Sequence, residues 1–259
     1  MSDVSRYLPL SQRPRHDESG VSSHWDAEVA AVLGSLVAGL RAQPTEAWQV
    51  STLHRGWTVH MSAAFLAQQL TTPILQRLTS AAFGIAEHVF SRSAAEKATA
   101  EKAAVALSTA EVLAILGGVV EATAARTRRS GIRDLEAAVV GGLDIAIPLG
   151  LDLALPASAS GAVALRRALA APVEIKAVIR GRSLRATDAD WGFGRGPELV
   201  DTAVGMLLFL YERSDVPPHP AGAADGRPGH ASGKADTDAG TGTGTEPGRT
   251  SGTAPDTDD

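Results

Sequence analysis

The chain has 259 residues, a formal net charge of −5 and no cysteine. The lack of cysteine excludes disulfides, thiolate-bound zinc, iron–sulfur clusters and a thiolate nucleophile belonging to the protein itself. The net charge comes entirely from residues 215–259, which hold eight acids and three bases, so the rest of the chain has no basic surplus with which to bind a nucleic acid.

The first expected element is an N-terminal arm, residues 1–22, whose low apolar content predicts disorder. Apolar residues then recur at helical spacing from Val29 to Leu40, behind a candidate cap at Ser22 or Ser23. Because proline interrupts a helix, the pattern predicts a first helix that ends before Pro44.

Three more helices are expected before residue 130. Apolar spacing predicts one helix over 59–72 and another over 74–89. Ser108 and Glu111 have the spacing of a capping box, in which each side chain satisfies a backbone amide at the start of a helix. A helix is therefore expected from Ser108 to the basic stretch 126–129, where cations suit the negative end of the helix dipole.

Two further helices begin the second half of the chain. The first, from Arg133 to about Ile147, is apolar on most sides, which predicts burial in the middle of a bundle. Pro148 is expected to end it. The next helix is expected over 157–170.

The apolar period then changes from that of a helix to that of a strand. Between Pro172 and Asp188, apolar residues alternate with polar ones on either side of Gly181, which predicts a β-hairpin. Pro197 and Glu198 are typical of the first turn of a helix, so a last helix is expected from there through Tyr211.

Together these elements predict a mainly α protein with a helical bundle over 23–150 and a small α+β region, a hairpin plus a helix, over 151–214. Residues 215–259 are rich in Gly, Thr, Pro and Asp, and we expect them to form a disordered acidic tail. Two apolar stretches, 112–120 and 141–155, are too short or too charged to cross a membrane. With no signal peptide pattern at the N-terminus, we expect a cytoplasmic protein without a membrane partner.

The residues alone offer little for catalysis or metal binding. The histidines of residues 23–214 are His24, His54, His60 and His88, and no two of them have the four-residue spacing that places both imidazoles on one helical face. The chain also lacks a Gly-x-Ser-x-Gly nucleophile elbow. The glycine-rich stretch 192–196 lacks the lysine and the βαβ setting of a phosphate loop, so we interpret it as a turn.

Four stretches resemble the mycothiol-dependent maleylpyruvate isomerase family. They are residues 52–59 with Trp48 before them, 140–150, 186–191 and 194–198, in that family's order. The resemblance implies a DinB-like four-helix bundle with additional helices, of the kind typical of mycothiol-producing actinobacteria. It also implies a divalent metal, usually zinc, that holds mycothiol as a thiolate for isomerisation of maleylpyruvate or for transfer to other electrophiles.

The positions that the resemblance assigns to the metal ligands carry no ligand in this chain. Phe65 and Gly141 stand at the two histidine positions, and Ala137 stands at the acidic position. We therefore expect a divergent member with a degenerate metal-binding domain, no resident cofactor and no catalytic residue. The remaining pocket is expected to be dry or to bind a small apolar ligand, with mycothiol as the ligand that the resemblance implies.

Two alternatives to this hypothesis stay open. His54, His60 and Glu136 are weak substitute ligands that would retain a metal-dependent mycothiol isomerase or transferase. Helical geometry opposes them, because Glu136 lies about 100° around the helix from position 137 and His60 is five residues from Phe65. The second alternative is a protein-interaction scaffold with the acidic tail as its partner-binding arm.

Four residues that match the resemblance are interpreted as structural. Asp144 lies in an apolar helix and needs a buried partner. Asp188 and Asp190, beside Trp191, can cap the turn at residue 192 and the last helix.

Overall fold

The computed structural model describes residues 24–72 and 92–222, and every structural statement below concerns those residues. The expected arm over 1–22, the expected helix over 74–89 and the tail from residue 223 onward lie outside them.

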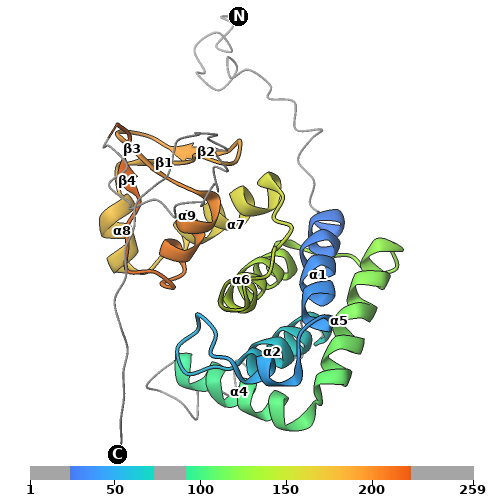
Figure 1. Ribbon diagram of the computed structural model, residues 1–259. Helices are drawn as coiled ribbons and strands as arrows, with labels where there is room; N and C mark the ends of the chain where they lie inside the picture. The colour runs from blue at the N-terminus through green and yellow to red at the C-terminus, as the bar shows by residue number, and fades with distance from the viewer. Residues whose placement is uncertain (1–23, 73–91, 223–259) are drawn as a thin grey trace, which may run out of the picture. The chain divides into compact units, whose positions relative to one another are not determined.

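Long helices form a bundle in the first part of the described chain (Figure 1). They are α1 (Asp26–Arg41), α2 (Val59–Thr71), α4 (Arg92–Ala106), α5 (Thr109–Ala124) and α6 (Ile132–Leu149), with a short 3-10 helix, η4 (Thr45–Gln49), after α1. Helix α1 packs on α5 and α6, and α2 packs on α4, α5 and α6. The apolar stripes that predict these helices bury one shared core, which includes Leu33, Leu36, Leu66, Leu116 and Leu135.

One helix start confirms its predicted cap and another does not. At the start of α5, Ser108 Oγ accepts a hydrogen bond from the Glu111 amide, while the Glu111 carboxylate accepts from the Ser108 amide at 2.8 Å. The expected cap of the first helix at Ser22 or Ser23 is wrong, since Trp25 occupies that position. The Trp25 amide instead donates to the Ser130 carbonyl at 2.9 Å, which joins the start of α1 to the turn before α6.

The expected end of the fifth helix at Pro148 is also wrong, because α6 includes Pro148 and its last residue is Leu149. Gly150 caps the helix in the left-handed conformation, with φ of +63°. Proline has no amide proton to donate to the carbonyl four residues earlier, which belongs to Asp144. That carbonyl accepts instead from the Leu53 amide at 3.2 Å, so the missing helical bond becomes a contact with the loop before α2.

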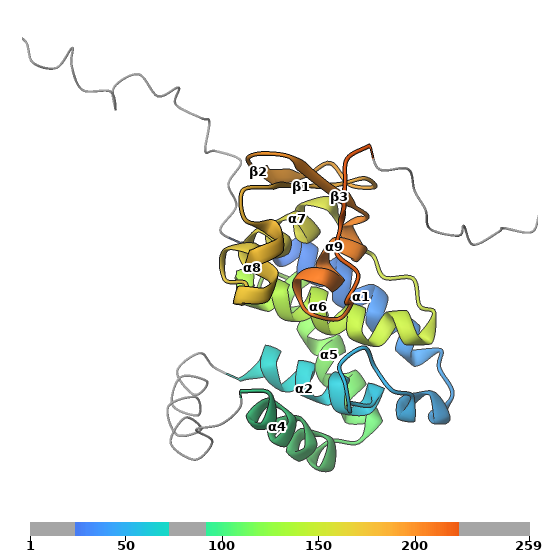
Figure 2. The same ribbon diagram turned by 90° about the vertical axis from the view of Figure 1, so that its left-hand side faces the viewer.

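The second part of the described chain adds short helices and a small sheet (Figure 2). The helices are α7 (Ala157–Leu169), α8 (Val173–Ile179) and α9 (Ala203–Leu210). The strands are β1 (Ser183–Ala186), β2 (Gly192–Gly194), β3 (Glu198–Asp201) and β4 (His219–Pro220), in the spatial order β2-β1-β3-β4. This mainly α architecture with a small C-terminal sheet confirms the predicted fold class.

The predicted hairpin over 172–188 is corrected in two respects. The alternating stretch 173–179 is helix α8 rather than a strand, and only Ile175 of its apolar residues is buried, while Val173 is 77 % exposed. The hairpin is formed by β1 and β2, so the glycine-rich stretch that we interpreted as a turn supplies a strand. A stretch of seven residues after a proline is too short to distinguish the apolar period of a helix from that of a strand.

The last helix begins later than its predicted start at Pro197. Glu198–Asp201 is strand β3, which pairs in parallel with β1, and α9 begins at Ala203 after Thr202 caps it. Residues 215–222, which we expected to belong to a disordered tail, include β4, which pairs antiparallel with β3.

No single helix of the described ranges has the length and apolar content needed to cross a membrane, whereas the bent pair Glu96–Ala106 and Thr109–Ala124 meets that test only when taken together.

Candidate functional site

An open cleft of about 1100 Å³ lies among α2, α6 and the segment that follows α9. Its lining residues on α6 are Arg133, Glu136, Ala137, Val140, Gly141 and Asp144, and those on α2 are Ser62, Phe65, Leu66 and Gln69. Both sets recur every three or four residues, so each is one continuous face of its helix. The loop 53–57, the start of α4, the end of α7 and residues 211–213 complete the wall.

The three positions that the resemblance assigns to metal ligands meet in this cleft. Phe65 projects from α2, and Ala137 and Gly141 lie one turn apart on α6. A Cβ atom at Gly141 would lie 3.3 Å from Leu66 Cδ1, so the leucine packs closely over the glycine. The Phe65 ring meets Trp57 edge to face, with centroids 5.1 Å apart. These positions therefore form an apolar floor, and the described residues include no cluster of three His, Asp or Glu side chains that could hold a metal ion.

The substitute ligands do not come together. His54 and Glu136 line the cleft, but His60 does not. Instead, His60 Nε2 lies 2.9 Å from the Leu107 carbonyl oxygen. The His54 ring stacks on Trp57, with centroids 4.2 Å apart. Burial lowers the pKa of His54, and the nearby Arg213 lowers it further, so the imidazole is neutral at neutral pH.

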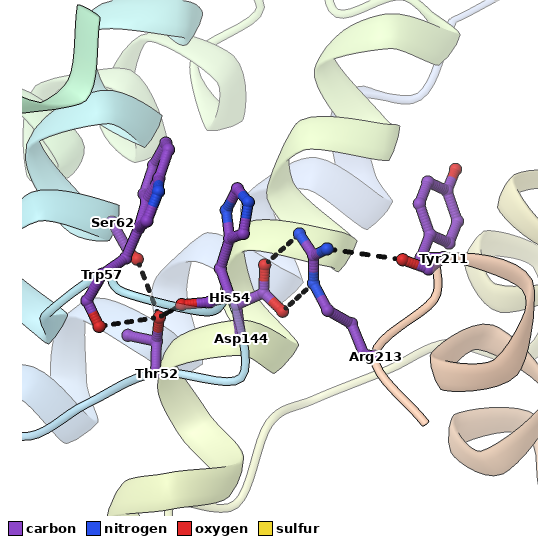
Figure 3. Close-up of polar contacts among 7 residues, drawn as sticks. All are labelled: Thr52, His54, Trp57, Ser62, Asp144, Tyr211 and Arg213. Atoms are coloured by element: carbon purple, nitrogen blue, oxygen red, sulfur yellow. Dashed lines mark hydrogen bonds and ion pairs between the residues drawn. The ribbon is translucent and has the colours of Figure 1, made fainter. Parts of the chain in front are cut away.

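The loop that carries His54 is fixed by one buried threonine (Figure 3). The Thr52 amide donates to the Trp57 carbonyl at 2.9 Å, and Thr52 Oγ1 lies 3.3 Å from that same oxygen. Thr52 Oγ1 also lies 3.3 Å from Ser62 Oγ in the first turns of α2. These bonds hold the aromatic side of the cleft against the bundle.

An ion pair between Asp144 and Arg213 lies beside the loop that carries His54 (Figure 3). Arg213 Nε and Nη2 donate to the two carboxylate oxygens of Asp144 at 2.7 and 2.9 Å, a bidentate geometry. The Asp144 side chain is 7 % exposed and the Arg213 side chain 19 %. The expectation that Asp144 needs a buried partner is confirmed, although sequence reasoning did not identify Arg213.

A second polar contact ties the segment after α9 to α6. Tyr211 Oη donates to Glu136 Oε1 at 2.8 Å, and Arg166 Nε donates to the other carboxylate oxygen at 2.6 Å. Burial and the Glu136 charge raise the pKa of Tyr211 well above its usual range. The phenol is therefore a fixed donor, and Glu136 is already occupied by two partners.

Backbone geometry at Glu212 directs this segment onto the cleft. Glu212 has φ of +60° and occupies the position after α9 that usually holds glycine. The Glu212 amide donates to the Phe209 carbonyl and the Arg213 amide to the Leu208 carbonyl, as in a Schellman motif. The turn brings the Arg213 side chain back towards α6.

Glu212→Gly is expected to raise the free energy of unfolding by about 0.5–1 kcal/mol, because glycine adopts positive φ without the Cβ strain of glutamate. The ion pair with Arg167 that would be lost is partly exposed and contributes less than this. Urea denaturation gives the difference, and Glu212→Gln, which removes the charge but keeps the strain, is the control. A Glu212→Gly variant no more stable than Glu212→Gln would contradict the assignment of strain.

Two of the remaining residues of the resemblance, Asp188 and Trp191, make structural contacts. Asp188 Oδ1 accepts from the Ala203 amide at 2.6 Å, which confirms its predicted role at the start of the last helix. Asp190 makes no such capping bond within the described ranges. Trp191 Nε1 donates to Ser160 Oγ at 3.0 Å, which fixes the β1–β2 turn against α7.

Comparisons with known proteins add one structural neighbour. No protein-family model and no curated protein matches the chain. Among solved structures, a crystal structure of a mycothiol-dependent maleylpyruvate isomerase aligns with a TM-score of 0.41 and 11 % sequence identity, covering 85 % of this chain and 96 % of that one. A likeness this slight does not assign the chain to that family.

Proposed function

We propose that the chain is a divergent relative of the mycothiol-dependent maleylpyruvate isomerases that binds a small organic molecule in its cleft without a metal ion. The observation that carries the proposal is the convergence of Phe65, Ala137 and Gly141, from two helices, on one cleft. Their meeting supports the register in which the resemblance aligns the chain, and the lack of a metal-binding side chain at all three positions supports the loss of a metal.

The surroundings of the floor favour binding over metal-dependent chemistry. Glu136 is held by Arg166 and Tyr211, and Asp144 by Arg213, so both carboxylates on the cleft face of α6 already have cationic or hydrogen-bonded partners. A metal would have to displace those partners before it could bind. The volume of about 1100 Å³ lies just above the usual range of small-molecule sites, about 300–1,000 Å³, so the cleft has room for such a ligand.

The experiment compares the zinc content of the unmodified protein with that of a triple variant, Phe65→His, Ala137→Glu and Gly141→His. After incubation with zinc and desalting, mass spectrometry is expected to find little zinc in the unmodified protein and about one ion per chain in the variant. The variant supplies two imidazoles and a carboxylate at positions that already line one cleft, one position on α2 and two on the same face of α6.

A second triple variant, Phe65→Leu, Ala137→Gln and Gly141→Ala, controls for changes in volume without adding a zinc ligand. Circular dichroism checks that both variants fold, because a side chain at position 141 must move Leu66 slightly. Stoichiometric zinc in the unmodified protein would overturn the proposal. A folded variant with His, Glu and His that takes up no zinc would overturn the alignment on which it rests.

A further inference from the structure

Charge in the cleft has the opposite sign to that of the whole chain. Among the described lining residues, six cationic side chains face four carboxylates, whereas the chain carries a net charge of −5. The cations are Arg55, Lys97, Arg133, Arg166, Arg167 and Arg213, and the carboxylates are Glu96, Glu136, Asp144 and Glu212. A positively charged cleft in an acidic protein favours an anionic ligand.

Three of the cations are already bound within the wall. Arg213 pairs with Asp144, while Arg166 pairs with Glu136 at 2.6 Å. Arg167 pairs with Glu212 at 3.0 Å and lies over the Tyr211 ring. These pairs shape the wall but leave little charge for a ligand.

The other three cations are compensated weakly. Arg55 lies 3.8 Å from Asp215, with both side chains more than 90 % exposed, and Lys97 lies 3.9 Å from Glu101. Exposed pairs at such distances contribute almost nothing. Arg133 has neither an ion pair nor a side-chain hydrogen bond within residues 24–72 and 92–222. As far as those described residues go, its guanidinium keeps all five donors for a ligand or for water.

Arg133 also lies at a useful distance from the apolar floor. It precedes Ala137 by one turn of α6, so their Cα atoms are separated by about 6 Å along the helix axis. Residues four apart lie on the same helical face, and both line the cleft. A molecule lying on Phe65 and Ala137 can thus place a charged end against Arg133.

We propose that the ligand of the cleft is an organic anion, with an apolar body on Phe65, Ala137 and Val140 and a carboxylate or similar oxyanion bound by Arg133. The inference rests on the proposed function, since it names the class of molecule that the same cleft binds. Arginine suits this role because its planar guanidinium binds an oxyanion through two parallel hydrogen bonds.

The test uses two fluorescent probes of similar size, one charged and one uncharged. They are 8-anilinonaphthalene-1-sulfonate, an anion, and N-phenyl-1-naphthylamine, which is neutral. The folded full-length protein is expected to bind both, since each has an apolar body. Arg133→Gln is expected to weaken binding of the anion about fivefold to tenfold and to change that of the neutral probe less than about twofold.

Three further variants make the result specific. Arg195→Gln removes an exposed arginine outside the cleft and is expected to change neither affinity. Arg133→Lys keeps the charge and is expected to retain part of the preference for the anion. Ala137→Trp fills the floor and is expected to abolish binding of both probes, which places them in the cleft.

The failures of the two proposals can be distinguished. Equal weakening of both probes by Arg133→Gln, or no weakening of either, would overturn the anionic ligand while leaving a small-molecule site in place. Binding of neither probe, or binding that Ala137→Trp leaves unchanged, would overturn the proposed function together with the inference.

Discussion

Asp144→Ala is expected to lower the free energy of unfolding by about 3 kcal/mol. The substitution removes the carboxylate that binds two nitrogen atoms of Arg213 and leaves that guanidinium largely buried without its partner. Breaking a buried ion pair from one side costs about 3–5 kcal/mol, and the 19 % exposure of Arg213 places this case near the lower end. Chemical denaturation followed by circular dichroism measures the loss.

The matched control is Glu198→Ala, which breaks another short arginine–carboxylate contact. Arg185 Nε lies 2.9 Å from Glu198, but the two side chains are 50 % and 36 % exposed, so solvent screens the contact and the expected loss is much smaller than that of Asp144→Ala. Arg213→Leu should cost at least as much as Asp144→Ala, because it leaves the more buried member of the pair without a partner. Similar losses from Asp144→Ala and Glu198→Ala would show that the cleft ion pair is not a structural contact.

Gly196→Ala is expected to lower the free energy of unfolding by about 3 kcal/mol or more. Gly196 has φ of +111°, a conformation open almost only to glycine, and an added Cβ would overlap the Gly181 carbonyl oxygen. The three nearest atoms to that Cβ all belong to the backbone of Gly181 and Arg182, so the turn before β3 would have to move away from β1. The parallel pairing of those strands would then be disturbed.

Gly181→Ala isolates the cost of the backbone conformation from the cost of the clash. Gly181 lies in the same pair of turns with φ of +69°, but no atom lies within 4 Å of an added Cβ. Alanine there should cost only about 1 kcal/mol. Thermal or urea denaturation of both variants gives the comparison, and equal losses would show that close packing of the two turns is unimportant.

The helices of the bundle could be predicted because their signals are local. An apolar stripe and a cap identify α5, and similar stripes identify α1, α2 and α6. Helix α4 lacks such a signal, since alanine, lysine and glutamate favour a helix without marking a buried face. Sequence reasoning therefore did not find it.

Strand β3 could not be predicted from its own residues. Its first residue, Glu198, follows Pro197, and a proline followed by a glutamate is equally typical of the start of a helix. Its partner β1 lies earlier in the chain and pairs with it in parallel. Parallel pairing depends on contacts between distant segments, which a local pattern does not report. The same reason applies to β4, because only its pairing with β3 distinguishes it from the tail that follows.

The cleft was predictable only in part. Helical spacing and the resemblance place Phe65, Ala137 and Gly141 together, and the structure brings them to one cleft. The contacts of Arg213 and Tyr211 with α6 carry no local signal, because Arg213 reaches α6 through the backbone turn at Glu212 and Tyr211 bonds a carboxylate 75 positions earlier. The one available clue is the need of a buried Asp144 for a cation, which several arginines in the chain could satisfy.

The pairing of Asp144 with a residue 69 positions later also sets an order of assembly. A ribosome makes the helices of the bundle well before it makes residue 213, so a nascent bundle holds the carboxylate without its guanidinium. Closing so long a loop is slow relative to forming local helices. The Asp144–Arg213 side of the cleft is therefore completed only near the end of synthesis.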